Sequence, residues 1–293
     1  MKNKRLPLEI ASEIVKVVAC DIGGRTAPLM CRPEYIQDAV EMICQMSRAV
    51  IVSGFYIGSA QEPETDGPGG AVILARALHE EGRRAEIWTD SLCRDAMAIC
   101  ARAAGFPEDH IFIHDTASFS SDGDIPDGII FIERPGKASD GKYYNFRKDD
   151  ITKWIAPLDD YINYARSMSI PTIGIGDGGN EAGMGVFKDA LSEKLPVYSQ
   201  CLSVVSADVA IPVDVSNWGA YALVTALSCI WGTWRGHRDM DEDRMLGALA
   251  GYGIVDGVKL SPSASVDGLE LEAQKKIISE LHKIWEKYCD IPL

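Results

Sequence analysis

Residues 171–185 read PTIGIGDGGNEAGMG, a short apolar strand that runs directly into a glycine-rich loop. Ile173 and Ile175 form the end of the predicted strand, and the ten residues after Ile175 include five glycines, one Asp, one Asn and one Glu. Glycine permits positive φ and lets backbone approach a ligand closely, but this freedom is costly in an ordered element. A loop of this composition directly after a strand predicts a binding site.

Strands and helices alternate on both sides of this loop. Apolar runs predict strands over 49–54, 85–89, 110–114, 128–132, 172–175 and 208–213. Helical apolar spacing predicts helices over 71–81, 91–104, 158–168 and 216–231. This alternation is typical of a mostly parallel sheet with helices on both faces, so we predict a Rossmann-like α/β fold.

The remaining segments extend this core. We expect a single α/β domain over 1–293, with a helical prelude over 1–48, the core sheet and site loops over 49–235, and C-terminal helices over 236–293. Asp267 and Glu270 have the spacing of a capping box, which predicts that the last helix has its N-cap at Asp267. The buried face of that helix is predicted to carry Ile277, Leu281, Ile284 and Tyr288.

Composition and charge exclude several classes of function. The 293 residues carry a net charge of −14, and nucleic-acid binding depends on clustered Lys and Arg, so no nucleic-acid partner is expected. No apolar run approaches the roughly 18 residues of a membrane helix, so no membrane partner is expected. The eight cysteines form no C-x-x-C pair, which favours free thiols and a cytoplasmic location. A homo-oligomer is compatible with these features.

Polar side chains recur where the predicted strands end. Ligands of open parallel sheets bind outside the carboxyl ends of the strands, so these positions share one edge. The candidates follow the first, fourth, fifth and sixth strands, and they are Asp66, Glu133, Arg134, Asp177, Asn180, Glu181, Asp214 and Asn217. Their shared position is stronger evidence for a site than any single motif.

These motifs also have a purely structural interpretation. Asp177 and Glu181 could stabilise the positive N-terminus of a following helix, an effect of about 0.3–1 kcal/mol. Asp66 before Gly67 and Pro68 could be a helix N-cap. The glycine-rich loop still favours a site, because a tight turn alone rarely needs Asp, Asn and Glu together.

Six motifs resemble those of one known family. They are residues 65–70 (TDGPGG), 133–136 (ERPG), 140–145 (DGKYYN), 157–160 (PLDD), 174–181 (GIGDGGNE) and 217–221 (NWGAY). In this order, over roughly residues 45–235, they are similar to the C-terminal domain of D-glutamate cyclase. The resemblance implies cyclisation of D-glutamate to 5-oxo-D-proline with loss of water. The two-domain cyclase also has an N-terminal region that resembles a hydro-lyase, and we find no counterpart of it in this sequence.

Cyclisation of glutamate defines the roles that a site must fill. It needs a base for the α-amine, an acid for the departing γ-carboxyl oxygen and donors for the oxyanion. Asp177, Glu181 and Asp66 are the candidate catalytic residues. Arg134 is a candidate for holding a carboxylate, and the N–H groups of Gly178 and Gly179 could face the oxyanion. The full set of candidate substrate-binding residues is Arg134, Glu133, Gly178, Gly179, Asn180, Lys137, Tyr144, Asn145, Asp214 and Asn217.

The loop over 134–147 is basic in an otherwise acidic chain. It carries Arg134, Lys137, Lys142 and Arg147, with tyrosines between them. A small anionic substrate needs cations and a cover that excludes water, and Gly136 and Gly141 could act as hinges. We therefore predict that residues 136–147 of this loop form a lid over an anionic ligand.

A metal ion is an open alternative. Asp66, Asp177 and Asp214 could converge on a hard cation such as Mg²⁺, because such ions prefer oxygen ligands. The same carboxylates could instead bind a substrate amine. The glycine loops lack the G-x-G-x-x-G spacing after the first strand, so no nicotinamide or flavin is expected.

Two classes of function remain. The first is an enzyme that acts on a small amino acid or carboxylate. The second is a ligand-binding or regulatory module that works with a separately encoded hydro-lyase-like partner. Turnover of D-glutamate by the isolated chain would distinguish them.

Overall fold

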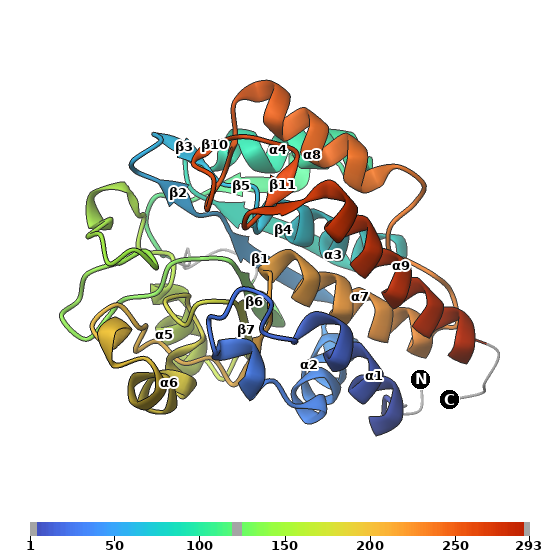
Figure 1. Cartoon of the computed structure of the whole chain (residues 1–293). Coiled ribbons are helices and arrows are strands. Elements are labelled where there is room, and N and C mark those ends of the chain that lie inside the picture. Colours follow the sequence, from blue (N-terminus) through green and yellow to red (C-terminus); the bar gives the residue numbers. More distant parts are fainter. Residues whose placement is uncertain (1–4, 119–124, 290–293) are drawn as a thin grey trace.

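A computed structural model describes residues 5–118 and 125–289, and six of its strands pair into one parallel sheet. The sheet order is β5-β4-β1-β6-β7-β8 (Figure 1). The strands are β1 (Arg48–Ser53), β4 (Arg84–Thr89), β5 (Ile111–Ile113), β6 (Gly128–Ile132), β7 (Thr172–Gly176) and β8 (Val209–Pro212). The predicted mostly parallel sheet is therefore confirmed. Both ends of each predicted strand lie within two residues of the ends of the observed strand.

The strand order creates a crevice at the carboxyl edge of the sheet. In chain order the six strands have the arrangement 3-2-1-4-5-6 that is typical of dinucleotide-binding folds. The first strand, β1, pairs with β4 on one side and with β6 on the other. The connections after β1 and β6 leave in opposite directions, so the space between them is where such sheets bind ligands.

Helices cover both faces of the sheet, but unequally. Alternate residues of a strand point to opposite faces, and accordingly Ile51 belongs to one apolar cluster while Val50 and Val52 belong to another. The first cluster packs the sheet against most of the helices, and the second packs it against α5. The helices are α1 (Leu8–Val18), α2 (Pro33–Gln45), α3 (Pro68–Glu80), α4 (Arg94–Ala104), α5 (Asp160–Ser167), α6 (Lys188–Lys194), α7 (Ser216–Trp231), α8 (Asp241–Tyr252) and α9 (Leu271–Tyr288).

Segments from the two ends of the chain lie side by side. Helix α1 runs beside α9 (Figure 1), and Lys287 Nζ lies 2.6 Å from Glu13 Oε1. The predicted apolar face of α9 is buried, as Ile277, Leu281 and Tyr288 show. Both helices also pack against α7, which in turn contacts β6, β7 and β8. The loop after α1 and the hairpin before α9 reach residues at the carboxyl edge of the sheet.

The capping-box prediction at Asp267 is wrong. Asp267 and Gly268 have φ values of +53° and +78° and form the turn of a small hairpin between β11 (Ser265–Val266) and β12 (Leu269–Glu270). Helix α9 begins at Leu271 and has no side-chain cap. Two other short hairpins, β2 (Tyr56–Ile57) with β3 (Glu62–Pro63) and β9 (Val255–Asp256) with β10 (Ser261–Pro262), also lie outside the predicted elements.

Two further expectations concern the environment of the chain. No helix within the described residues has the length and apolar character needed to cross a membrane. The eight cysteines are all unbridged thiols.

Candidate active site

Three buried carboxyl groups meet at the carboxyl edge of the sheet. Asp66 lies in the loop after β1, Glu133 directly follows β6, and Asp177 directly follows β7. Each offers an oxygen within 4.8 Å of the other two, and this trio is the one group of potential metal ligands among residues 5–118 and 125–289. All three were predicted from the strand ends, and the parallel sheet brings them together.

Two more acids and one arginine complete this group. Glu64, which is buried, and Asp267, whose side chain is 9% exposed, lie beside the trio, and we call the five carboxyl groups the acid cluster. Arg25 forms an ion pair with Asp177 and another with Asp267, the second at 3.3 Å. Sequence analysis missed Arg25, Glu64 and Asp267 as site residues. Glu64 had a signal, since it stands two residues before Asp66 in the same loop.

Burial displaces the pKa values of the acid cluster. Desolvation raises the pKa of Asp66 and of Asp177 from 3.8 to about 7, and the positive charge of Arg25 opposes this rise at Asp177. Burial also raises the pKa of Glu64, Glu133 and Asp267 well above the ordinary range, and neighbouring carboxylates raise it further. Near neutral pH Asp66 and Asp177 are therefore close to half-ionisation, and burial favours the protonated form of the other three acids.

The acid cluster borders a cavity of about 430 Å³. Glu64, Glu133 and Asp267 line it together with Arg25 and the predicted residue Asn180. Asp66 and Asp177 are not among the lining residues, but each has an oxygen within 4.8 Å of the lining residue Glu133. The lining also carries two aromatic rings and two further cations, from Phe146, Arg147, Lys148 and Tyr198. The cavity thus combines acidic groups with positively charged ones.

The glycine-rich loop folds back on the strand that precedes it. A Cβ atom on Gly183 would lie 2.7 Å from Gly174 Cα, so this close approach of two backbone segments requires glycine. The next α-helix, α6, begins only at Lys188. Asp177 and Glu181 therefore do not stabilise its first turn, and the helix-terminus interpretation of these two acids is wrong.

Glu181 organises this loop instead of facing the cavity. Its carboxylate accepts the N–H groups of Gly178 and Gly179 at 2.8 and 2.7 Å, and of Asp177 at 3.3 Å. The prediction that Gly178 and Gly179 donate to an oxyanion does not hold in this structure, because both N–H groups already have an acceptor. By holding these backbone groups, Glu181 fixes the position of Asp177.

Asp66 and Asn217 join the loop after β1 to the start of α7. Asp66 accepts the N–H groups of Ser216 and Asn217, each at 2.8 Å, which places a carboxylate at the positive N-terminus of α7. Asn217 Oδ1 accepts the N–H groups of Gly67 and Gly70 at 3.0 and 2.6 Å. Asp66 is thus a cap of α7 and not of α3, and Asn217 is engaged with backbone and not with the cavity.

Arg134 does not reach the cavity. Its guanidinium is fully buried and pairs with Asp90 Oδ2 at 2.5 Å. It also donates to the carbonyl oxygens of Gly54 at 3.0 Å and Ala156 at 2.5 Å. The prediction that Arg134 binds substrate is corrected. Its position after β6 places the residue at the carboxyl edge of the sheet, but it does not determine the direction of the side chain.

The basic loop contributes to the cavity only through its later part. Lys137 pairs with Asp160 at 2.6 Å, and the Tyr144 hydroxyl donates to Asp140 at 2.7 Å, so neither is directed at a ligand. Asn145 lines the cavity, as do the three residues after it. The last part of the region predicted to be a lid, residues 145–147, therefore lines the cavity together with Lys148.

Asp214 is separate from the trio that could hold a metal ion. Its Oδ2 and Oδ1 accept the N–H groups of Cys20 and Ile22 at 2.6 and 2.7 Å. The predicted metal set of Asp66, Asp177 and Asp214 is accordingly replaced by Asp66, Glu133 and Asp177. Three carboxylate oxygens suit a hard divalent cation, although Arg25 already contacts Asp177 and backbone N–H groups already contact Asp66.

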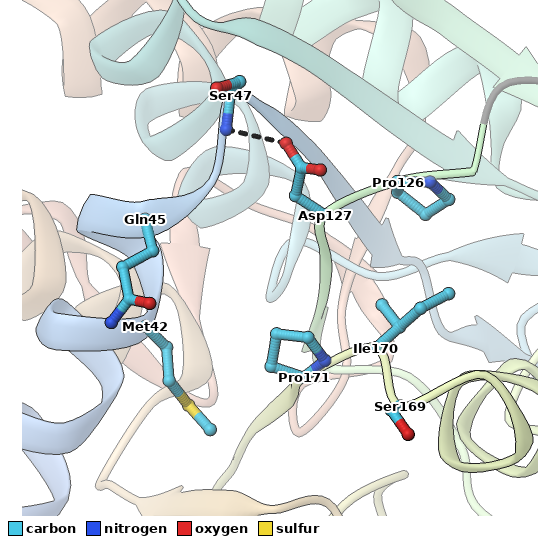
Figure 2. Close-up of a pocket in the computed structure, with 8 residues that line it drawn as sticks. All are labelled: Met42, Gln45, Ser47, Pro126, Asp127, Ser169, Ile170 and Pro171. Carbon is cyan, nitrogen blue, oxygen red and sulfur yellow. Dashed lines mark hydrogen bonds between the residues drawn. The ribbon is translucent and has the colours of Figure 1, made fainter.

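A hollow of about 540 Å³ lies at the opposite, amino edge of the sheet (Figure 2). Its lining includes Met42, Gln45 and Pro171 and one ionisable group, Asp127. Asp127 accepts the N–H of Ser47 at 2.8 Å, as Figure 2 shows, so its charge is used to hold backbone. The hollow lacks chemistry comparable with the acid cluster.

Comparison with known proteins shows the family to which the chain belongs. The sequence model of the family described as "D-glutamate cyclase-like, C-terminal" matches residues 14–282, so the chain belongs to this family. Over 303 aligned positions the chain is 30% identical to "D-glutamate cyclase, mitochondrial" of Homo sapiens. The alignment covers 88% of this chain and 48% of the human protein, so the chain spans about half the length of that relative.

Proposed function

We propose that this chain is a D-glutamate cyclase-like enzyme, a lyase that converts D-glutamate or a closely related small amino acid to 5-oxo-D-proline and water. The observation that carries the proposal is the acid cluster, whose buried carboxyl groups have displaced pKa values and border a cavity that also presents cations. Family membership and the name of the human relative support it.

The reaction moves protons from nitrogen to oxygen. A bond forms between the α-nitrogen and the γ-carbon, and the bond between the γ-carbon and one of its oxygens breaks. The ammonium group loses two protons, and the departing oxygen gains two protons and leaves as water. Groups that titrate near the working pH carry out such transfers best.

The acid cluster can both accept protons from the substrate and donate protons to it. Asp177 and Asp66, with pKa values of about 7, are ionised often enough near neutral pH to accept protons, which reach them from the ammonium group through the cavity-lining Glu133. Burial and neighbouring carboxylates raise the pKa of Glu133 and favour its protonated form, from which it donates to the departing oxygen. Because the facing oxygens of Glu133 and Asp177 lie within 4.8 Å, a proton taken up by one can be returned through the other.

The cavity also matches the charges of the substrate. Arg25, Arg147 and Lys148 line it and complement carboxylate groups. Burial raises the pKa of Glu64 and Asp267, which lowers the negative charge of this wall and its repulsion of an anionic ligand. An ionised member of the cluster attracts the ammonium group.

Incubation of the purified chain with D-glutamate tests the proposal. Chiral chromatography with mass detection should find 5-oxo-D-proline, and the Asp177→Asn variant should form at least about 100-fold less. Asp189→Asn, which changes an exposed carboxylate on α6, is the matched control and should behave as the parent. A parent chain that forms no product alone would contradict the proposal. Product formed only after addition of a hydro-lyase-like protein would favour the alternative, a ligand-binding or regulatory module.

A further inference from the structure

A short segment near the N-terminus carries a cation into the site. Residues 20–26, which we call the strap, connect α1 to the segment before α2. Asp214, which lies just beyond β8, accepts N–H groups of the strap with both carboxylate oxygens, from Cys20 at 2.6 Å and from Ile22 at 2.7 Å. Asp21 Oδ1 accepts the N–H of Thr26 at 2.8 Å. These bonds give the strap a defined path across the carboxyl edge.

Arg25 of the strap is held between the acid cluster and an aromatic stack. Its guanidinium pairs with Asp177 and with Asp267, the latter at 3.3 Å. On the other side it lies 5.4 Å from the ring centroid of Phe146, which stacks on Tyr198 at 4.4 Å with an interplanar angle of 13°. The side chain is 18% exposed and lines the cavity. One side of a positioned guanidinium therefore faces the space for a ligand.

The other arginines near the site have different partners. Arg134 is fully buried and donates to Asp90 and to two carbonyl oxygens. Arg147 donates to the carbonyl oxygens of Gly257 and Val258 at 3.0 and 2.9 Å. Within the part of the chain that the structure describes, Arg25 is the cavity-lining arginine that contacts the acid cluster.

We propose that Arg25 binds the α-carboxylate of the substrate and that Asp214 is a positioning residue that holds Arg25 in place through the strap. The inference rests on the proposed function, because it takes the substrate to be an amino acid with a second carboxyl group. The ammonium and the α-carboxylate are attached to one carbon, so their binding partners must be neighbours. Arg25 and Asp177 are neighbours, and a guanidinium has five N–H donors to share between them and a ligand.

Calorimetric titration with two ligands tests the role of Arg25. The parent protein should bind D-glutamate about 10- to 100-fold more tightly than D-isoglutamine, its α-amide, because the amide cannot form the charge-assisted pair. In Arg25→Gln this preference should disappear, with D-glutamate weakened to the level of the amide. Arg25→Lys keeps the charge without the bidentate fork and should retain part of the preference. Arg32→Gln, an exposed arginine shortly after the strap, is the matched control.

A double-variant comparison tests the role of Asp214. Asp214→Asn removes one acceptor and should weaken D-glutamate binding about 3- to 10-fold by loosening the strap. The same change should have no further effect in the Arg25→Gln background, because the residue that it positions is already gone. Losses that multiply in the double variant would overturn the positioning role, since they would mean that Asp214 acts independently of Arg25.

The possible outcomes separate this inference from the proposed function. An Arg25→Gln or Arg25→Lys protein that is folded and still prefers D-glutamate as the parent does would overturn the inference and leave the cyclase proposal standing. A parent that binds D-glutamate with the expected preference but forms no 5-oxo-D-proline would overturn the cyclase proposal and support the role of Arg25. A parent that binds neither ligand would overturn both.

Discussion

Replacing Asp177 by Asn should abolish turnover and still make the protein more stable above neutral pH. The pKa of this carboxyl group is 3.8 in its ordinary state and about 7 in the folded chain. The folded state holds the proton more tightly, so the free energy of unfolding falls as the pH rises between these values, by up to about 1.4 kcal/mol per pH unit. The protonated Asp177 carboxyl group thus adds about 4 kcal/mol to the free energy of unfolding below pH 3.8, and this contribution is lost above pH 7.

Asparagine does not ionise, so the variant avoids this loss. Arg25 keeps its ion pair with Asp267 in the variant, and no cation is left without a partner. Asp177→Asn should therefore exceed the parent in unfolding free energy at pH 8 by up to about 4 kcal/mol, and the gap should widen by about 1 kcal/mol between pH 6 and pH 8. Turnover should fall by about 10²–10⁴, the usual effect of losing a general base.

Urea unfolding at pH 6 and pH 8, together with a turnover assay, checks both halves of this prediction. Asp189→Asn should change neither the pH dependence nor the turnover, since its carboxylate is exposed. An Asp177→Asn protein that is less stable than the parent at both pH values would refute the reasoning from burial. Full turnover in the variant would refute the assignment of Asp177 to the base.

Three further predictions concern residues around the cluster. Glu181→Gln should lower the unfolding free energy by about 1–3 kcal/mol in urea titrations, because an amide cannot accept all the N–H groups that the carboxylate holds. Gly67→Ala should be markedly more destabilising than Gly82→Ala in thermal unfolding: both glycines have positive φ, but only at Gly67 would the new Cβ lie 2.8 Å from a side-chain oxygen. Arg134→Gln should cost about 3–5 kcal/mol of stability by removing the cation of a buried pair, while calorimetry of the folded protein finds D-glutamate affinity unchanged.

The sheet could be predicted from sequence because its signals are local. Apolar runs and helical spacing mark each strand and helix, and alternation alone then favours a parallel sheet. The strand ends also predicted that Asp66, Glu133 and Asp177 would share one edge, and they do. The position of a residue at the end of a parallel strand is a property of the fold, so it can be inferred without knowing any side-chain contact.

The rest of the site depends on contacts that sequence spacing does not reveal. Arg134 and Asp214 lie at the expected edge of the sheet. However, Arg134 pairs with the buried Asp90, and Asp214 accepts N–H groups of the strap. Arg25 and Asp267 come from segments outside the core sheet, where local patterns suggested only a prelude and a helix cap. Their convergence on Asp177 joins parts of the chain that are far apart in sequence.

A structure of the protein in complex with 5-oxo-D-proline tests the central claim most directly. The account predicts that the ligand lies in the cavity of about 430 Å³, with its carboxylate at Arg25 and its ring nitrogen facing the acid cluster around Asp177. Two results would contradict the account. In one, the ligand lies in the hollow beside Asp127 at the amino edge. In the other, it lies in the cavity with its carboxylate turned away from Arg25.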